Sequence, residues 1–273
     1  MKIIDKSFYA SWENDPDKGE FLIGQGLIKN KHFLSDYSYV YIALSPLINE
    51  KGIFQTQKII DDIVRENINT KLIFVCQHIF INQIKWGYNS TVFSTHATKH
   101  DDIIFIPHYS ATYNISKIKE EKDLLFSFVG HCGTHEIREA LIKKYPDKCF
   151  STEGIWMSTK YRDKYIDLLG RSKFSICPRG TGVSSLRIFE SLKMGSIPVV
   201  ISDDLHLPIT HSWDEFSVRI NENEIDKIEE ILLQYSDERI KNMSLLGQEY
   251  WNSCCSDENL YKTIIETLKN KDE

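Results

Sequence analysis

The segment from Phe174 to Pro208 reads FSICPRGTGVSSLRIFESLKMGSIPVVISDDLHLP and indicates the fold class more strongly than any other part of the chain. Its apolar runs Phe174–Cys177 and Ile197–Ile201 are typical of buried strands. Between them lies a glycine-containing turn, and the apolar pattern over Ser184–Met194 then predicts a helix. A strand, a tight turn, a helix and a second strand make one unit of a parallel α/β sheet.

The turn of this segment has the composition of a phosphate-binding loop. Gly180 and Gly182 permit positive φ and close approach of the backbone to a ligand. Ser184 and Ser185 are residue types that favour a helix N-cap, so the free N–H groups and the positive end of the helix dipole would face the loop. Arg179 adds a planar cation beside them. We therefore predict that this turn binds phosphate.

A carboxylate follows the turn on the same predicted helix. Glu190 lies about two turns into the helix. From there an acidic side chain can accept hydrogen bonds from ribose hydroxyls, as in dinucleotide-binding folds. Its neighbours Ile188, Phe189 and Leu192 are apolar and leave no clean polar face around it. These features favour nucleotide binding over the role of a solvated helix residue.

Outside this segment, short apolar runs alternate with longer amphipathic ones, which is the pattern of a parallel α/β fold. Further strands are expected at Tyr39–Leu44, Leu72–Val75, Ile103–Ile106 and Leu124–Val129. Further helices are expected at Thr56–Asn67, Thr134–Lys144, Tyr161–Leu169, Glu222–Gln234, Glu238–Trp251 and Asp257–Lys269.

The polar run Ser110–Asp123 separates two such series of strands and helices, and we take it as the domain boundary, although a solvated loop inside one domain has the same composition. The predicted organisation is an N-terminal lobe at residues 1–120, a C-terminal lobe at 121–255 that contains the phosphate-binding turn, and a C-terminal helix at 256–273. Two such lobes would leave a cleft between the carboxyl ends of their sheets, where open α/β sheets bind ligands.

Composition excludes several classes of protein. The 273 residues carry a net charge of -6, and no lysine or arginine run exceeds two, so nucleic-acid binding is not expected. No apolar stretch is long enough for a membrane span, and the N-terminus does not resemble a signal peptide. The 6 cysteines include no Cys-x-x-Cys pair, which favours reduced thiols over a zinc ribbon.

Several runs resemble the exostosin-like glycosyltransferases, the family of heparan sulfate polymerases and plant cell-wall sugar transferases. Its C-P-R-G, R-[LI]-F-E, G-x-[IV]-P-V-[VI]-[IL]-S-D-D and W-x-x-F-S-V runs are matched at Cys177–Gly180, Arg187–Glu190, Gly195–Asp204 and Trp213–Val218. Its F-x-G run with a following arginine, and its strand ending in an apolar residue and proline, are matched more loosely by Phe128–Gly130 with Arg138, and by Ile106-Pro107.

This resemblance, which is strong over about Leu124 to Val218, implies a GT-B fold with two Rossmann-like lobes facing a central cleft. It also implies an inverting transfer from a UDP-sugar to a hydroxyl of a glycan acceptor. Carried over to this chain, Arg138 and Arg179 would hold the diphosphate and Glu190 the ribose. Arg187 would either bind the diphosphate or position the helix through a salt bridge. Backbone N–H groups would come from Thr181 to Ser185, and the donor-binding loop residues would be Gly180, Thr181, Gly182, Ser184 and Ser185.

The resemblance further implies catalysis without a metal ion or other cofactor, because arginines and a helix N-terminus can stabilise the departing nucleoside diphosphate. The run Asp15-Pro16-Asp17 matches a metal-binding D-x-D pattern, but its polar context favours a turn. His131 and His135 lack a third ligand at a convincing spacing, so helix-capping or cleft-lining roles are favoured. No metal ligands are expected.

An inverting transfer needs a general base to deprotonate the acceptor hydroxyl, and a GT-B arrangement would place it on the first lobe. The candidates are Glu13, Asp15 and His78. Glu13 is the first choice, because Trp12 beside it could stack on an acceptor sugar. Each of the three can also be a solvated loop residue or a hydrogen-bonded histidine without a catalytic role.

Two other functions fit the same residues: a fucosyltransferase-like enzyme that uses a GDP-sugar, and a non-catalytic module that binds a sugar or nucleotide. In the main interpretation the partners are a nucleotide sugar and a glycan, with no nucleic acid and no membrane span. Golgi members of the family carry an N-terminal membrane segment that this chain lacks. The expectation is a cytoplasmic enzyme, bacterial or viral, or a trimmed piece of a longer protein.

Overall fold

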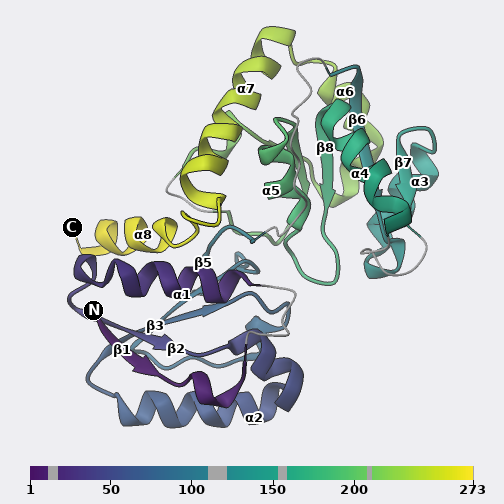
Figure 1. Cartoon of the computed structure of the whole chain (residues 1–273). Coiled ribbons are helices and arrows are strands. Elements are labelled where there is room, and N and C mark those ends of the chain that lie inside the picture. Colours follow the sequence, from purple (N-terminus) through teal and green to yellow (C-terminus); the bar gives the residue numbers. More distant parts are fainter. Residues whose placement is uncertain (12–17, 110–121, 153–158, 208–210, 273) are drawn as a thin grey trace. The chain divides into compact units, whose positions relative to one another are not determined.

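The computed structural model of the chain describes residues 1–11, 18–109, 122–152, 159–207 and 211–272. They form two compact units (Figure 1). The first consists of Met1–Ala111, Asp204–His211 and Ser253–Glu273, and the second of Thr112–Asp203 and Ser212–Asn252. Each unit has a five-stranded parallel sheet with helices packed on it, which confirms the predicted α/β class with two parallel sheets.

The first sheet has its strands in the order of the chain. They are β1 (Lys2–Asp5), β2 (Tyr37–Tyr41), β3 (Lys71–Cys76), β4 (Ser90–Ser94) and β5 (Ile104–Phe105). The helices of this unit are α1 (Gly19–Lys29), α2 (Leu44–Glu66), which is kinked at Gly52, and α8 (Lys262–Asp272).

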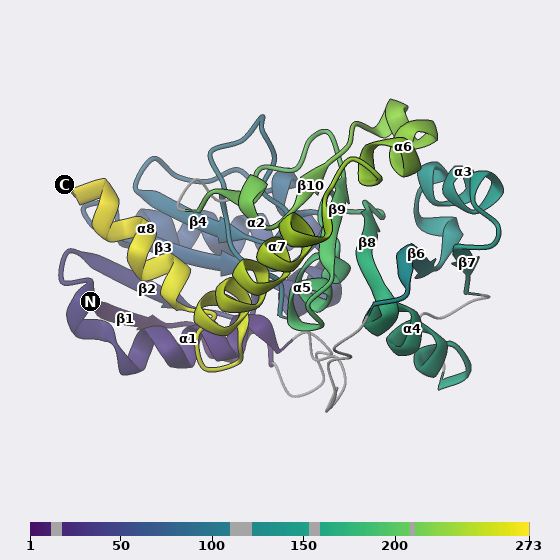
Figure 2. The same ribbon diagram turned by 90° about the horizontal axis from the view of Figure 1, so that it is seen from above.

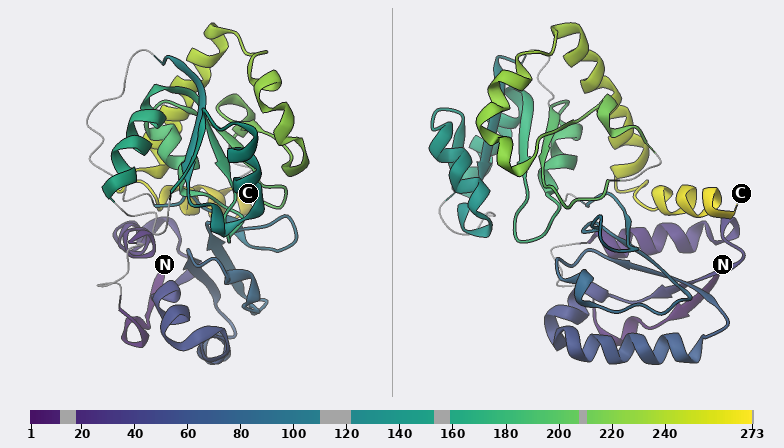
Figure 3. Two further views of the ribbon diagram at one scale, coloured as in Figure 1. Left: turned by 90° about the vertical axis from the view of Figure 1, so that its right-hand side faces the viewer. Right: turned by 180° about the vertical axis from the view of Figure 1, so that it is seen from behind.

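Helices α1 and α8 lie on one face of the first sheet and α2 lies on the other (Figure 3). Apolar side chains of α1 and α8, among them Ile23, Leu27 and Ile264, form one buried cluster with Ile73 and Val75 of β3. The C-terminal helix, expected from the sequence as a separate segment, is therefore part of the core of the first unit.

The second sheet runs in the order β10-β9-β8-β6-β7, as Figure 2 shows. Its strands are β6 (Leu124–Gly130), β7 (Cys149–Ser151), β8 (Ser172–Pro178), β9 (Ile197–Ile201) and β10 (Val218–Arg219). Its helices are α3 (Glu136–Lys144), α4 (Thr159–Arg171), α5 (Leu186–Lys193), α6 (Ile228–Leu232) and α7 (Asp237–Tyr250).

The order of the second sheet contains a topological switch point. From β6 the chain passes outward to β7 and then returns to β8 on the other side of β6. The carboxyl ends of two strands that diverge in this way are where open parallel sheets bind ligands. In this unit they are Gly130, at the end of β6, and Pro178, at the end of β8. The Cys177–Gly180 turn therefore lies at the switch point.

Each expected strand is present, with bounds shifted by at most three residues, and Ile197–Ile201 matches residue for residue. Strands β1, β4, β7 and β10 and helix α1 were not expected. Helix α2 begins at Leu44, twelve residues before the expected start at Thr56. Short helical turns, mostly 3-10, complete the described secondary structure at Ser7–Tyr9, Lys31–Phe33, Ile81–Gln83, Cys132–Thr134, Trp213–Glu215, Glu222–Lys227 and, as a π-helical turn, Trp251–Cys255.

Helix length and composition also bear on membranes. Among the residues that the structure describes, no helix is both long enough and apolar enough to cross a lipid bilayer.

Candidate functional site

Arg138, on α3, joins the ends of the two strands at the switch point. Its Nε donates to the carbonyl oxygen of Arg179 at 2.8 Å, Nη1 to that of His131 at 3.1 Å, and Nη2 to that of Pro178 at 3.2 Å. The side chain is buried. A Cβ atom on Gly180 would lie only 3.0 Å from Nη2, so the glycine lets the turn approach this arginine. Arg138 thus shapes the turn by holding its carbonyl groups.

Arg187, in the first turn of α5, reaches the same place from the other side. Its Nε donates to the carbonyl oxygen of Val129, in β6, at 3.0 Å. The guanidinium lies over the ring of Phe128, 5.0 Å from the ring centroid. A Cβ atom on Gly130 would lie 2.4 Å from Arg187 Nη2, so a larger residue here would displace the guanidinium from its present position. The Phe128–Gly130 run and the arginine of the R-[LI]-F-E run therefore pack against each other.

The salt bridge considered for Arg187 is absent from the described part of the chain, where the residue positions α5 through the Val129 carbonyl instead. Its Nη1 makes no hydrogen bond to any described residue. Arg138 likewise has no carboxylate within salt-bridge distance among these residues. Burial and the nearby charge of Arg187 lower the pKa of Arg138, yet a guanidinium stays protonated in proteins. Two neighbouring cations without a counter-ion favour the binding of an anion.

Helix α5 presents its N-terminus to the turn without a side-chain cap. Ser185 is the N-cap residue, with extended backbone angles (φ -139°, ψ 131°), and its side chain makes no capping bond. Its Oγ is buried and has no hydrogen-bond partner in the described residues. The predicted start of the helix at Ser184 or Ser185 is thus close to the observed one. The first N–H groups of α5 are left without a side-chain acceptor.

The turn itself differs from the prediction in one respect. Neither Gly180 nor Gly182 has a positive φ. The turn is closed by a hydrogen bond from the Gly180 N–H to the Gly182 carbonyl oxygen at 3.2 Å. Gly180 is needed for close approach to Arg138 rather than for a left-handed backbone. Thr181 is exposed, whereas Ser184 is buried.

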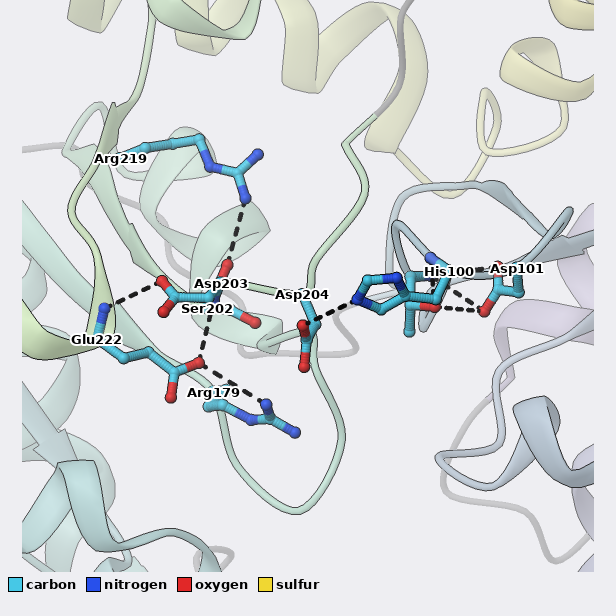
Figure 4. Close-up of polar contacts among 9 residues, drawn as sticks. His100, Asp101, Arg179, Ser202, Asp203, Asp204, Arg219 and Glu222 are labelled. Carbon is cyan, nitrogen blue, oxygen red and sulfur yellow. Dashed lines mark hydrogen bonds and ion pairs between the residues drawn. The ribbon is translucent and has the colours of Figure 1, made fainter.

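Arg179 points toward an acidic residue that follows β10. Its Nη1 lies 3.7 Å from Glu222 Oε1 (Figure 4). Asp203 and Glu222 exchange hydrogen bonds of 3.0 Å, each donating its backbone N–H to the other's carboxylate. The next residue, Asp204, belongs to the first unit, where its Oδ1 lies 3.6 Å from His100 Nε2. Asp203 and Asp204 thus make contacts within a turn and a loop, and a ligand of Arg179 would compete with Glu222.

Glu190 is buried and accepts a hydrogen bond from the hydroxyl of Tyr165, on α4. Burial, and then the neighbouring Glu190 carboxylate, raise the pKa of Tyr165 well above its ordinary value, so the phenol keeps the proton that it donates. Glu190 is therefore not a solvated helix residue, and a ribose hydroxyl would share the carboxylate with Tyr165.

The candidates for a general base are only partly placed. Glu13 and Asp15 lie outside the described residues. His78 accepts the Phe80 N–H at Nδ1 (3.1 Å), so its neutral ring carries the proton on Nε2, which lies 3.2 Å from Asn49 Oδ1. Burial lowers the pKa of His78. Because both ring nitrogens are engaged, His78 would have to release one partner before it could accept a proton.

His135 caps α3 by accepting the N–H of Ile137, as the sequence favoured, and His131 Nδ1 lies 3.3 Å from the Thr152 carbonyl oxygen. Two residues of the site were not predicted, Tyr165 and Glu222. Tyr165 lies in the middle of an amphipathic helix and Glu222 follows a two-residue strand. Neither position carries a sequence signal, since their partners lie 25 and 19 residues away along the chain.

Comparison with known proteins identifies a family to which this sequence is similar. Residues 53–235 match the exostosin GT47 domain. A protein of Arabidopsis thaliana named "Probable glycosyltransferase" is 36% identical over 77 residues, which cover 28% of this chain and 16% of that protein. A rice protein (Oryza sativa subsp. japonica) named "Probable glucuronosyltransferase" is 33% identical over 94 residues, 33% of this chain and 22% of its own length.

The exostosin-1 homolog of Caenorhabditis elegans is 36% identical over 84 residues, 30% of this chain and 22% of that protein. The chain thus spans about a fifth of the length of these curated relatives.

Proposed function

The chain belongs to the exostosin GT47 family of glycosyltransferases, and we propose that its second unit binds the diphosphate of a UDP-sugar at the switch point between β6 and β8. The observation that carries this proposal is the pair of guanidinium groups of Arg138 and Arg187, which lie there without a carboxylate partner among the described residues. Neutral donors beside them come from the uncapped N-terminus of α5 and from the buried Ser185 hydroxyl, which has no partner in the part of the chain that the structure describes.

The three arginines have different parts in this proposal. Each guanidinium nitrogen of Arg138 donates one N–H to a backbone carbonyl. Arg138 therefore mainly holds the turn in place and adds its positive charge to the diphosphate site. Arg187 donates to the Val129 carbonyl oxygen through Nε and Nη2, and in this proposal its Nη1 donates to a phosphate oxygen. Arg179 binds the diphosphate by exchanging its long ion pair with Glu222 for a closer one. Glu190, held by Tyr165, accepts from the ribose.

We further propose that the enzyme inverts the anomeric carbon and moves the sugar to a hydroxyl of a glycan acceptor. As the bond from the sugar to the diphosphate breaks, negative charge grows on the leaving group, and fixed cations and N–H groups stabilise it without reorganisation. This chemistry needs no metal ion. The relatives' names include a glucuronosyltransferase, which makes UDP-glucuronic acid one donor to test first.

We propose that the general base is a residue of the first unit. Glu13 is the first choice, with Asp15 and His78 as the alternatives. The engaged ring of His78 makes it the weakest of the three.

One experiment tests donor binding and catalysis together. Melting temperatures would be measured with UDP, with GDP and without nucleotide, each series with and without chelator. Donor hydrolysis and transfer would be followed with a panel of nucleotide sugars for the wild type and Glu13→Gln. We expect UDP to raise the melting temperature by mass action, equally with chelator, and Glu13→Gln to keep this shift while turnover falls on the order of 100-fold.

A larger shift with GDP would instead favour the fucosyltransferase-like function. A UDP shift without hydrolysis or transfer for any donor would indicate a non-catalytic binding module. Loss of the UDP shift in chelator would contradict metal-independent binding, and wild-type turnover in Glu13→Gln would move the base to Asp15 or His78.

A further inference from the structure

Three side chains with different metal-binding atoms meet in the first unit, outside the proposed donor site. They are His211, Cys254 and Glu266, and their ligand atoms all lie within 4.8 Å of one another. Within the residues that the structure describes, this is the one group of three histidine, cysteine or acidic side chains close enough to hold a metal ion. The spacing of the three along the chain gives no motif, so the sequence does not reveal the group.

The donor atoms suit one class of ion. An imidazole nitrogen, a thiolate and a carboxylate oxygen together are ligands that Zn²⁺ prefers, whereas Mg²⁺ and Ca²⁺ take oxygen ligands. In a tetrahedral zinc site neighbouring ligand atoms are about 3.5 Å apart, given metal–ligand distances of about 2.0–2.3 Å. The three side chains would therefore close in by about an ångström, which a partly exposed histidine and an exposed glutamate can do.

The surroundings of Cys254 fit a thiolate ligand. The sulfur is buried, and the Ser253 hydroxyl lies 3.4 Å from it. Thr263, one turn before Glu266 on α8, is buried, and its hydroxyl has no hydrogen-bond partner in the described residues. Hydroxyl groups that donate to a ligand sulfur are the usual outer support of a metal site. Without a cation, a thiolate this close to the Glu266 carboxylate would be a repulsive pair.

The three ligands come from two segments far apart in sequence. His211 belongs to the first unit, as do residues 204–206, where the His206 N–H donates to the Ala97 carbonyl oxygen at 3.1 Å. Cys254 lies in the π-helical turn Trp251–Cys255 and Glu266 in α8. Helix α8 is anchored in the core by Ile264, so the carboxylate is presented from a rigid support. An ion at this place would fasten the 204–211 segment to the C-terminal segment.

We propose that His211, Cys254 and Glu266 bind one Zn²⁺ ion, with a fourth position left for water. Binding displaces the proton of the Cys254 thiol, and the ion is held by the neutral imidazole, the thiolate and the carboxylate. The site supports the first unit and takes no part in the sugar transfer. It stands independently of the proposed donor site, which lies in the other unit.

The test uses the full chain, stripped of metal with a chelator that is then removed. Co²⁺ is titrated in as a spectroscopic probe, and Zn²⁺ is titrated by calorimetry. We expect one equivalent of Co²⁺ to bind with a sulfur-to-cobalt charge-transfer band, and one equivalent of Zn²⁺ to remove that band. Cys254→Ser should abolish the band. Glu266→Gln and His211→Gln should each weaken Zn²⁺ binding at least tenfold.

Matched controls separate this site from other thiols and acids. Cys255→Ser changes the neighbouring buried cysteine, and Glu258→Gln removes an exposed charge from the same segment, and both should bind as the wild type does. Glu266 is exposed, so Glu266→Gln reports on binding without a loss of fold. Its UDP-induced shift in melting temperature should equal that of the wild type. Absence of Co²⁺ uptake, or unchanged Zn²⁺ binding in both Cys254→Ser and Glu266→Gln, would overturn the proposal.

Discussion

At the scale of single residues, two arginines at the site make different hydrogen bonds and therefore have different roles. Arg138 and Arg187 both lie at the switch point, but Arg138 donates to three carbonyl groups whereas Arg187 donates to one. Glu190 is as buried as the core and depends on Tyr165 for a hydrogen bond. A carboxylate in such surroundings is costly unless it is satisfied, which is consistent with a second partner in the ligand.

Glu190→Gln tests the ribose assignment while preserving shape. The amide can still accept from Tyr165, but it loses the charge that strengthens a hydrogen bond to a ribose hydroxyl. The lost interaction is the same in the ground and transition states, so we expect the donor KM to rise about tenfold or more with little change in kcat. Steady-state kinetics with the active donor would measure both. An unchanged KM would show that Glu190 serves only the contact with Tyr165.

At the scale of helices and strands, α5 and α7 of the second unit both have a serine as the N-cap residue but differ in one respect. On α7, Ser236 Oγ accepts the Arg239 N–H at 3.2 Å, so the helix caps itself. On α5, Ser185 occupies the same N-cap position but makes no such bond. A helix end that lacks its own cap, beside two guanidinium groups with no carboxylate partner among the described residues, offers N–H donors to an anion.

Ser185→Ala and Ser236→Ala should therefore separate stability from binding. Ser185→Ala removes no side-chain hydrogen bond to a described residue, so we expect the free energy of unfolding to change by less than about 0.5 kcal/mol while UDP affinity falls several-fold. Ser236→Ala should cost about 1 kcal/mol and leave UDP affinity unchanged. Urea unfolding and UDP titration calorimetry check the pair. The opposite pattern would mean that the Ser185 hydroxyl supports the fold rather than a ligand.

At the scale of the whole molecule, acid sensitivity is expected to arise in the first unit. His96 and His108 are buried there with ring centroids 5.4 Å apart. Burial lowers the pKa of His108 to about 4, and burial together with His108 and His78 lowers that of His96 well below its ordinary value. Both rings are therefore neutral in the folded protein. In the unfolded chain they would take up protons below pH about 6.5.

The stability of the first unit should fall as the pH drops from about 6.5 to 4. In that window the unfolded chain binds more protons than the folded one, so the free energy of unfolding decreases. For His108 a pKa lowered from 6.5 to about 4 corresponds to a loss on the order of 3 kcal/mol. Urea unfolding at several pH values should show a shallower dependence for His108→Gln than for the wild type. The exposed His32→Gln is the control, and equal slopes in all three proteins would contradict the assignment.

Local patterns in the sequence determined the strand, turn, helix and strand of 174–204, because apolar period and turn residues act over a few positions. They also favoured the helix cap at His135, which the structure shows. The phosphate-binding turn and the boundary at Ser110–Asp123 stay predictions. Helix α1 was not predicted, because its three glycines lower the helix propensity of the segment. In the structure Gly24 and Gly26 give room to Tyr39, Tyr41 and Tyr261, so packing overrides propensity.

Tertiary structure alone decided what depends on partners distant along the chain. It set the switch point between β6 and β8, the carbonyl groups that Arg138 and Arg187 hold, and the pairing of Glu190 with Tyr165. It also brought α8 into the first core and His211 to Cys254 and Glu266. Such contacts follow from strand order and helix packing, which join residues tens to hundreds of positions apart. No periodicity or motif over a short window predicts these long-range contacts, because many chain paths share the same local pattern.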